Sequence, residues 1–198
     1  MELKGIITAM VTPMDKQQKI NYHATRQLIN HLIDSGVNGI FILGTNGEFH
    51  LLTREEKLEF AEAVIEEVNK RVPVFIGTGG NGTEEVIELS KEMEKIGADA
   101  LSIITPYFIT PSQNEVIKHY EKIADSVSLP ILLYNIPGRT GMTLEPETVA
   151  ELAKVDNILG IKDSSGKFEN IKNYIDITKN EKFSVLAGTD SLILKTLM

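Results

Sequence analysis

One lysine lies where an amine could act as a nucleophile. Lys162 follows the apolar run 158–161, and the polar residues 163–166 come directly after that run and the lysine. A short apolar run bounded by turn residues predicts a buried strand, so an amine at its last position would be partly desolvated. Because desolvation disfavours the ammonium form, such a lysine can attack a carbonyl carbon and form a Schiff base. The alternative is an ordinary strand-end lysine whose amine reaches solvent or pairs with Asp163.

Other polar residues follow other apolar runs, and their types suit carbonyl chemistry. Tyr134 could move protons while an imine forms, and Thr45 could relay protons to it. Backbone N–H groups near Thr45 and Asn46 could bind a carboxylate, and Arg139 could hold a second carboxylate through a two-pronged contact. For Tyr134 the alternative is a tyrosine that caps the core. For Arg139 it is a loop arginine in a surface ion pair.

The elements that must position these residues follow one repeating pattern. Strand-like apolar runs recur about every 25–35 residues, the length of a βαβ unit, and amphipathic stretches lie between them. The runs are 5–11, 39–43, 72–76, 100–104, 129–133, 158–161 and 183–186, and the expected helices include 24–35, 54–70, 84–96, 114–126 and 146–154. Because the runs are almost uniformly apolar rather than alternating, they predict a parallel sheet covered by helices.

Several residues mark the ends of the expected helices. Thr53, with Glu56 three residues later, is typical of a helix N-cap. Thr83, which precedes two glutamates, predicts a second N-cap. Gly36 and Gly97 stand where helices end, because glycine adopts the left-handed backbone conformation of a C-terminal cap without strain.

The order of these units predicts the fold class. Seven βα units without a linker or a low-complexity tract indicate an α/β protein of the (β/α)8 TIM-barrel type rather than a doubly wound sheet. A complete barrel takes eight units and ~250 residues, whereas these 198 residues end just after the seventh run. We therefore expect residues 1–198 to form a single catalytic barrel domain, truncated after the seventh strand and without the C-terminal helices. In such a barrel the active site lies at the C-terminal ends of the strands, where Lys162 and Tyr134 stand.

The composition argues against several other functions. The net charge is −8 and no cluster of Lys and Arg occurs, which argues against a nucleic-acid partner. There are no cysteines, so disulfides, thiolate metal sites and cysteine nucleophiles are excluded, and a reducing compartment fits. The start lacks a signal-peptide pattern, and no apolar stretch approaches the ~20 residues that cross a bilayer. We expect a soluble cytoplasmic protein that does not bind a membrane.

A glycine-rich stretch resembles a dinucleotide-binding loop but lacks its context. Residues 77–82 read GTGGNG and lie between an expected strand and an expected helix. They follow the third strand rather than the first. Thr105 ends the next strand, where a ribose-binding acid would stand, and Asp99 comes before that strand. A barrel loop is the better interpretation, and we expect no cofactor. No metal-ligand spacing links the four histidines, so we expect no metal site; they are His23, His31, His50 and His119.

Taken together, these residues resemble the dihydrodipicolinate synthase / N-acetylneuraminate lyase family of Schiff-base class I aldolases. The resemblance spans the chain and rests on GTNGE (44–48), TPY (105–107), YNIPGRTG (134–141), GIKD (160–163) and GTD (188–190). It implies that Lys162 forms an imine with pyruvate and that Tyr134 is the central proton-transfer residue. It also implies that Thr45 joins the relay, that Thr45 and Asn46 bind the pyruvate carboxylate, and that Gly188 offers its carbonyl near the substrate. A lyase without cofactor, acting as a homo-oligomer (dimer or tetramer), is implied as well.

Within that family, the residues that would meet the second substrate point in two directions. Arg139 resembles the synthase branch, the 4-hydroxy-tetrahydrodipicolinate synthases, in which an arginine there receives the carboxylate of the aldehyde substrate. Asn46 stands where that branch typically has a second threonine. Phe108 stands where it typically has a second tyrosine, which reaches across a dimer interface, although Tyr107 beside it is kept as a substrate-binding candidate.

The interpretation that we adopt is a lyase that condenses pyruvate with aspartate semialdehyde, in lysine and diaminopimelate biosynthesis. One alternative is an aldolase that cleaves a 2-keto-3-deoxy sugar acid or sialic acid to pyruvate and an aldehyde. Another is a catalytically silent fragment or binding protein.

Overall fold

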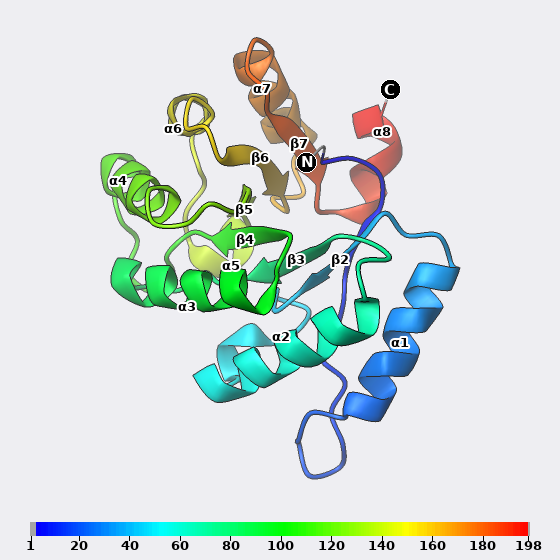
Figure 1. Ribbon diagram of the computed structural model, residues 1–198. Helices are drawn as coiled ribbons and strands as arrows, with labels where there is room; N and C mark the ends of the chain where they lie inside the picture. Colours follow the sequence, from blue (N-terminus) through cyan, green and yellow to red (C-terminus); the bar gives the residue numbers. More distant parts are fainter. Residues whose placement is uncertain (1–2, 198) are drawn as a thin grey trace.

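The computed structural model describes residues 3–197, which form a curled sheet of seven parallel strands with helices on its outer side (Figure 1). The strands are β1 (Ile7–Ala9), β2 (Gly39–Ile42), β3 (Val74–Gly77), β4 (Ala100–Ile104), β5 (Ile131–Asn135), β6 (Ile158–Asp163) and β7 (Ser184–Ala187). Each strand pairs with its neighbours in the sequence, in the order β1-β2-β3-β4-β5-β6-β7. The predicted barrel with seven strands is thereby confirmed.

Helices connect successive strands, as expected for βα units. They are α1 (Tyr22–Asp34), α2 (Arg54–Val68), α3 (Thr83–Ile96), α4 (Gln113–Ala124), α5 (Pro137–Thr140), α6 (Pro146–Leu152), α7 (Phe168–Thr178) and α8 (Ile193–Leu197), with short 3-10 helices η1 (Phe49–Leu51) and η2 (Asp190–Leu192). In the described part of the chain, no helix combines the length and the apolar character that crossing a membrane requires.

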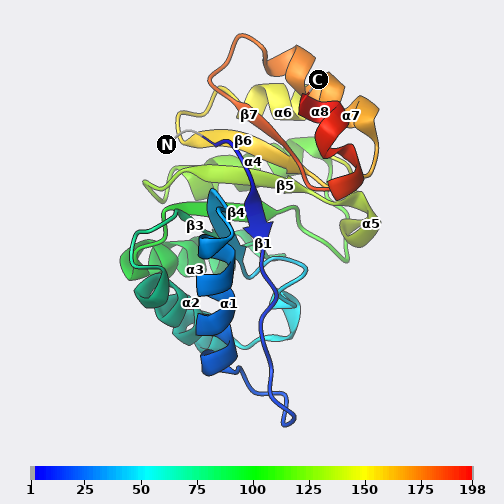
Figure 2. The ribbon, with the colours of Figure 1, turned by 90° about the vertical axis from the view of Figure 1, so that its right-hand side faces the viewer.

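The central strands and the edge strands differ in burial. Every residue of β2, β3, β4 and β5 is buried, because the inner face of the sheet packs on itself and the outer face packs on the helices. The strands β1 and β7 are only half-buried. Within residues 3–197 each of them pairs with a strand on one side only, and both lie toward the viewer in Figure 2.

The amino-terminal segment covers the barrel near β6. Leu3 is buried, and a Cβ atom on Gly160 would lie 3.1 Å from its side chain. Gly160 lies two residues before Lys162 on β6. The contact with Leu3 therefore fills the interior nearer to the start of the strand than Lys162 does. The strand ends are left free to form a site.

Most predicted helix ends are confirmed, and one is wrong. Thr53 caps α2 in a reciprocal pair of hydrogen bonds with Glu56, and Gly36 and Gly97 have the left-handed backbone of helix C-termini. Thr83 is not an N-cap, because α3 begins at Thr83 itself and a glycine precedes it. Its hydroxyl is instead 2.9 Å from Nδ1 of the buried His119 on α4, so it is engaged by the neighbouring helix.

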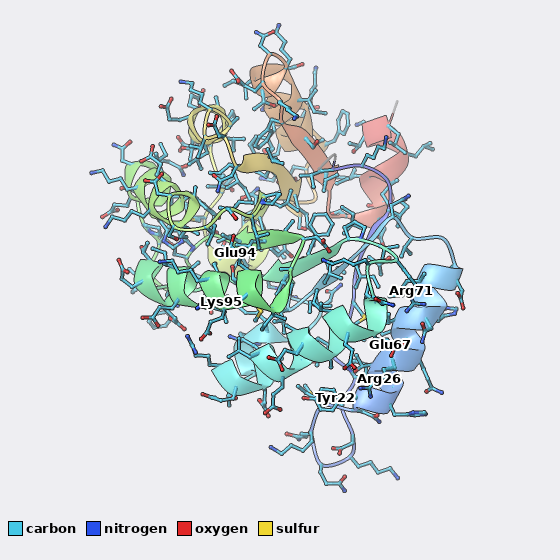
Figure 3. All side chains as sticks on the ribbon, in the orientation of Figure 1. Tyr22, Arg26, Glu67, Arg71, Glu94 and Lys95 are labelled. Carbon is cyan, nitrogen blue, oxygen red and sulfur yellow. The ribbon has the colours of Figure 1, made fainter. Side chains whose placement is uncertain are left out.

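Ion pairs join the outer helices at the surface. Arg26 Nε of α1 lies 3.4 Å from Glu67 Oε2 of α2, and Arg71 lies 3.9 Å from the same carboxylate (Figure 3). All three side chains are partly solvated, so these pairs contribute little to stability. The stability of the fold therefore comes mainly from the buried core and the hydrogen-bonded sheet.

Candidate active site

The site begins with two residues that the sheet pairs side by side. Tyr134 of β5 lies opposite Lys162 of β6 in the register of the two strands. The Lys162 amine nitrogen lies 4.3 Å from the centre of the Tyr134 ring and 4.8 Å from the centre of the Phe41 ring on β2. The two rings meet edge to face, with centres 6.1 Å apart. The amine therefore lies over two aromatic faces inside the mouth of the barrel.

This environment favours the neutral amine of Lys162. Burial lowers the pKa of Lys162 from 10.5 to about 8, although the charge of Asp190 acts in the opposite direction. At pH 7 an amine with a pKa of about 8 is neutral in roughly one molecule in ten, against roughly one in three thousand for a pKa of 10.5. Since only the neutral amine attacks a carbonyl, burial increases the reactive population by about 300-fold.

The alternative of a solvated or ion-paired lysine does not fit this geometry. The carboxylate of Asp163 is buried and accepts hydrogen bonds from the side chains of Asn135 and Ser165. Among the described residues, no ion pair joins Asp163 to Lys162. Within residues 3–197, Lys162 therefore forms no ion pair at this strand end, and the charge of Asp190 favours its ammonium form less than burial disfavours it.

Thr45 contacts Tyr134 from the loop after β2. The two hydroxyl oxygens are 3.3 Å apart, and either can donate. The backbone enters this loop through Leu43, whose φ of +54° lies in the left-handed region that costs a residue with a side chain some strain. A Cβ atom at Gly77 would lie 2.0 Å from the Leu43 carbonyl oxygen, so glycine at that position lets the neighbouring strand approach the loop.

The same loop presents two free backbone donors. The N–H groups of Gly47 and Phe49 donate to the Gly44 carbonyl, which closes the turn. Within residues 3–197, the N–H groups of Thr45 and Asn46 donate to no other residue. Two adjacent N–H groups beside a buried hydroxyl can bind a carboxylate, as expected for these positions. The side chain of Asn46 itself is exposed.

Gly188 lies against the stem of Lys162, at the end of β7. Its N–H donates to the carbonyl of Asp163 (2.7 Å). A Cβ atom at Gly188 would lie 3.0 Å from Lys162 Cε and 2.1 Å from the Ser164 hydroxyl. Only glycine fits here, and the close contact puts this backbone beside the amine. That the Gly188 carbonyl faces a substrate stays a prediction.

Two predicted site residues lie on the rim and not among the central group. Arg139 is exposed on α5, the short helix that follows β5. Tyr107 is partly buried, and its ring meets the Phe49 ring edge to face at 6.2 Å. Burial raises the pKa of the Tyr107 hydroxyl, so this group stays protonated at neutral pH. The rings beside the Lys162 amine are those of Tyr134 and Phe41.

Phe108, next to Tyr107, points out of the molecule. Its side chain is 89% exposed, and its φ of +75° lies in the left-handed region. Ile109 beside it is exposed as well. Within one chain, the hydroxyls that meet at the site are therefore those of Thr45 and Tyr134, and Phe108 adds nothing to them.

The sequence did not identify Phe41 as a site residue. Because β2 is apolar throughout, its pattern does not tell which side chains face the interior. A pocket continues inward from Tyr134 and is lined by Phe41, Leu43, Gly44, Phe49, Gly77, Gly79, Ser102, Ile104 and Tyr134. Two glycines of the GTGGNG stretch line this pocket, where close packing against β2 and β4 requires them. In the part of the chain described, no group of three or more His, Cys, Asp or Glu could hold a metal ion.

Comparisons with known proteins agree with this arrangement. The model of the dihydrodipicolinate synthetase family matches residues 2–198. The chain is 45% identical over 197 residues to a 4-hydroxy-tetrahydrodipicolinate synthase of Oceanobacillus iheyensis, covering 100% of this chain and 66% of the relative. A dihydrodipicolinate synthase structure from Bacillus anthracis superposes with a TM-score of 0.95 at 40% identity, covering 100% of this chain and 68% of that one.

A third comparison concerns a solved complex. The chloride-inhibited dihydrodipicolinate synthase from Acinetobacter baumannii, complexed with pyruvate, superposes with a TM-score of 0.94 at 40% identity. The match covers 98% of this chain and 66% of that one. The present chain thus spans about two thirds of the length of the relatives that it matches.

Proposed function

This chain belongs to the dihydrodipicolinate synthetase family, and on that basis we propose that Lys162 forms a Schiff base with pyruvate. The observation that carries the proposal is the amine of the partly buried Lys162, which lies over the rings of Tyr134 and Phe41 and has a pKa lowered to about 8. A relative that is 40% identical was crystallised with pyruvate, which supports the choice of ligand.

The first half of the reaction uses the residues around Lys162. The neutral amine attacks the keto carbon of pyruvate, and a proton moves from nitrogen to the former carbonyl oxygen, giving a carbinolamine. Tyr134 donates a second proton to this oxygen, which leaves as water while the C=N bond forms. The product is a protonated imine and a tyrosinate, and the hydroxyl of Thr45, 3.3 Å from that of Tyr134, donates a hydrogen bond to the tyrosinate oxygen until that oxygen takes up a proton again. The free N–H groups of Thr45 and Asn46 hold the pyruvate carboxylate.

The second half forms a carbon–carbon bond. The tyrosinate of Tyr134 takes a proton from the pyruvate methyl group, which converts the protonated imine to a neutral enamine. The enamine carbon then attacks the aldehyde carbon of the second substrate. The aldehyde oxygen takes up a proton, and attack of an amine or water on the imine carbon releases Lys162. For this second substrate we propose aspartate semialdehyde, because its carboxylate suits the exposed guanidinium of Arg139 at the rim.

One observation favours a second candidate function. Phe108 has no hydroxyl and is almost fully exposed, so it cannot extend a proton relay. An aldolase that cleaves a 2-keto-3-deoxy sugar acid would use the same enamine with a different aldehyde. Activity with sugar acids and none with aspartate semialdehyde would establish that alternative.

We further propose a cytoplasmic homo-oligomer, a dimer or a tetramer. The lack of cysteine fits a reducing compartment. The exposed apolar side chains of Leu51, Phe108 and Ile109 are of the kind that subunit contacts cover.

Reductive trapping tests the central proposal. Borohydride added with pyruvate should attach a stable adduct to Lys162, located by mass mapping of peptides. Lys162→Met should abolish the adduct, while the matched control Lys167→Met, at an exposed lysine nearby, should retain it. An adduct on another lysine, or none in folded protein, would overturn the assignment.

A further inference from the structure

The residues that follow Tyr134 and Lys162 form a second, buried pair behind the site. Asn135 lies opposite Asp163 in the same register that pairs Tyr134 with Lys162. Successive side chains of a strand point to opposite faces, so the first pair faces the barrel interior and the second pair faces the helices. Asn135 is 0% exposed and Asp163 is 1% exposed.

Hydrogen bonds join this pair to α7 and to the segment before α6. The Asn135 amide donates to Asp163 Oδ1 (2.6 Å) and to the Tyr174 hydroxyl (3.3 Å). The side-chain oxygen Oδ1 of Asn135 accepts a hydrogen bond from the Leu144 N–H (3.1 Å). Tyr174 in turn donates to the Leu144 carbonyl (2.5 Å), and the Ser165 hydroxyl donates to Asp163 Oδ2 (2.6 Å). We call Asn135, Asp163 and Tyr174 the brace.

The brace acts as one unit because its members depend on one another. Both carboxylate oxygens of Asp163 and all polar atoms of the Asn135 side chain are used. A carboxylate is tolerated in the interior only when it is hydrogen-bonded. Loss of one hydrogen-bonding partner would therefore leave the buried charge of Asp163 partly uncompensated. Burial and the charge of Asp163 raise the pKa of Tyr174, which keeps its hydroxyl a donor.

The strand pairing is irregular at the far end of β5 and regular toward the site. Ile131 lies opposite Ile158, but Leu132 lies opposite Gly160, so the register shifts between the first two residues of β5. From Leu132 to Asn135 the pairing is regular, and the side-chain hydrogen bond between Asn135 and Asp163 reinforces the last of these pairs at the site end of the two strands. The brace lies at that end, one residue beyond Tyr134 and Lys162.

We propose that the brace sets the position of the Tyr134 hydroxyl relative to the Lys162 amine by fixing β5 against β6. Its three members are positioning residues, since they lie on the outer face of the sheet and reach the site only through the strands. The inference rests on the proposed imine chemistry. Proton transfer between a tyrosine and a carbinolamine requires close alignment, and a displacement of about 1 Å can cost about 100-fold in rate.

Three substitutions separate positioning from stability. Tyr174→Phe removes one hydroxyl and keeps the ring. Asp163→Ala removes the acceptor, whereas Asp163→Asn retains an acceptor for Asn135 and a hydrogen-bonding group for Ser165. The matched control is Thr178→Val, because Thr178 is buried on the same helix and its hydroxyl donates to the backbone carbonyl of Tyr174 (2.7 Å), not to any side chain of the brace.

The readouts are the rate of imine formation in a borohydride time course, the KM for pyruvate, kcat, and thermal melting. Tyr174→Phe and Asp163→Ala should slow imine formation and lower kcat by about 10–100-fold per folded molecule. The KM for pyruvate should change less than the rate, because the N–H donors of Thr45 and Asn46 lie on another loop. Asp163→Asn should keep most of the rate of imine formation that Asp163→Ala loses. Thr178→Val should lower the melting temperature and leave that rate unchanged.

Each outcome decides a separate point. If Tyr174→Phe and Asp163→Ala melt earlier but form the imine at the unmodified rate, the brace only stabilises the fold and the inference is wrong. If Asp163→Ala does not fold, the rate of Tyr174→Phe decides alone. If the unmodified protein forms no adduct with pyruvate, the proposed function fails, and that result is seen before any brace variant is compared.

Discussion

The burial that favours the neutral amine of Lys162 should also lower the stability of the protein at neutral pH. The pKa of Lys162 falls from 10.5 to about 8 in the folded chain because burial disfavours its ammonium form. Between these two values the unfolded chain binds more protons than the folded chain, so stability rises with pH through this window. The cost is fully present below about pH 8 and is lost above about pH 10.5.

The size of the cost follows from the same two values. The change from 10.5 to about 8 corresponds to about 3 kcal/mol of destabilisation at pH 7. The rings of Tyr134 and Phe41 attract the ammonium group, which offsets about 0.5–2 kcal/mol. Lys162→Met, which keeps an unbranched chain of similar size, should therefore raise the free energy of unfolding by about 1–3 kcal/mol at pH 7.

Urea unfolding followed by circular dichroism measures this effect. The unmodified protein, Lys162→Met and the control Lys91→Met, at an exposed lysine on α3, are compared at about pH 7 and about pH 10. The gain from Lys162→Met should shrink at the higher pH, and the control should show no such dependence. A variant that is less stable than the unmodified protein at pH 7, or a gain that is equal at both pH values, would refute the reasoning.

Two further substitutions and a comparison of two polypeptides test the site and the sheet. Tyr134→Phe should lower kcat by ~10²–10⁴-fold while slow trapping of pyruvate persists, because a positioned proton donor is lost; unchanged turnover in steady-state assays would make Tyr134 a packing residue. Arg139→Ala should raise the KM for an acidic aldehyde and leave the KM for pyruvate nearly unchanged; an equal loss for both would mean that Arg139 supports the shape of the site. A polypeptide of residues 1–198 should self-associate in light scattering and melt without a cooperative transition, because β1 and β7 each pair on one side only. A version extended by a further βα unit should not; a cooperative monomer of 1–198 with full trapping would contradict this expectation.

The strands could be predicted because their physical cause is local. A strand that is buried on both faces is largely apolar, and turn residues follow it. The run 158–161 therefore predicted both β6 and the position of Lys162 at the end of that run. The cap at Thr53 is local as well. Thr83 was misjudged because its hydroxyl is taken by His119, a residue of another helix that no nearby sequence reveals.

The contacts inside the site depend on how the barrel curls. Thr45 and Tyr134 are 89 residues apart, and their hydroxyls meet only because β2 and β5 face a common interior. The same holds for Phe41, whose ring lies below the Lys162 amine. The buried hydrogen bonds of Asn135 could not be predicted, because the apolar run of β5 does not show which face each residue occupies.

The division between the centre of the site and its rim explains why the first substrate is easier to infer than the second. At the centre, Lys162, Tyr134 and Thr45 are held by three strands or their loops within contact distance, and these groups can carry out imine and enamine chemistry with pyruvate. At the rim, Arg139 is exposed on a four-residue helix, and Phe108 is exposed on a loop. Neither is constrained by contacts at the Lys162 amine, so in the proposed reaction changes there should alter which aldehyde is accepted without changing the bond-forming step. On this proposal the pyruvate half of the reaction depends on the fold, and the range of aldehydes depends on a few loop side chains.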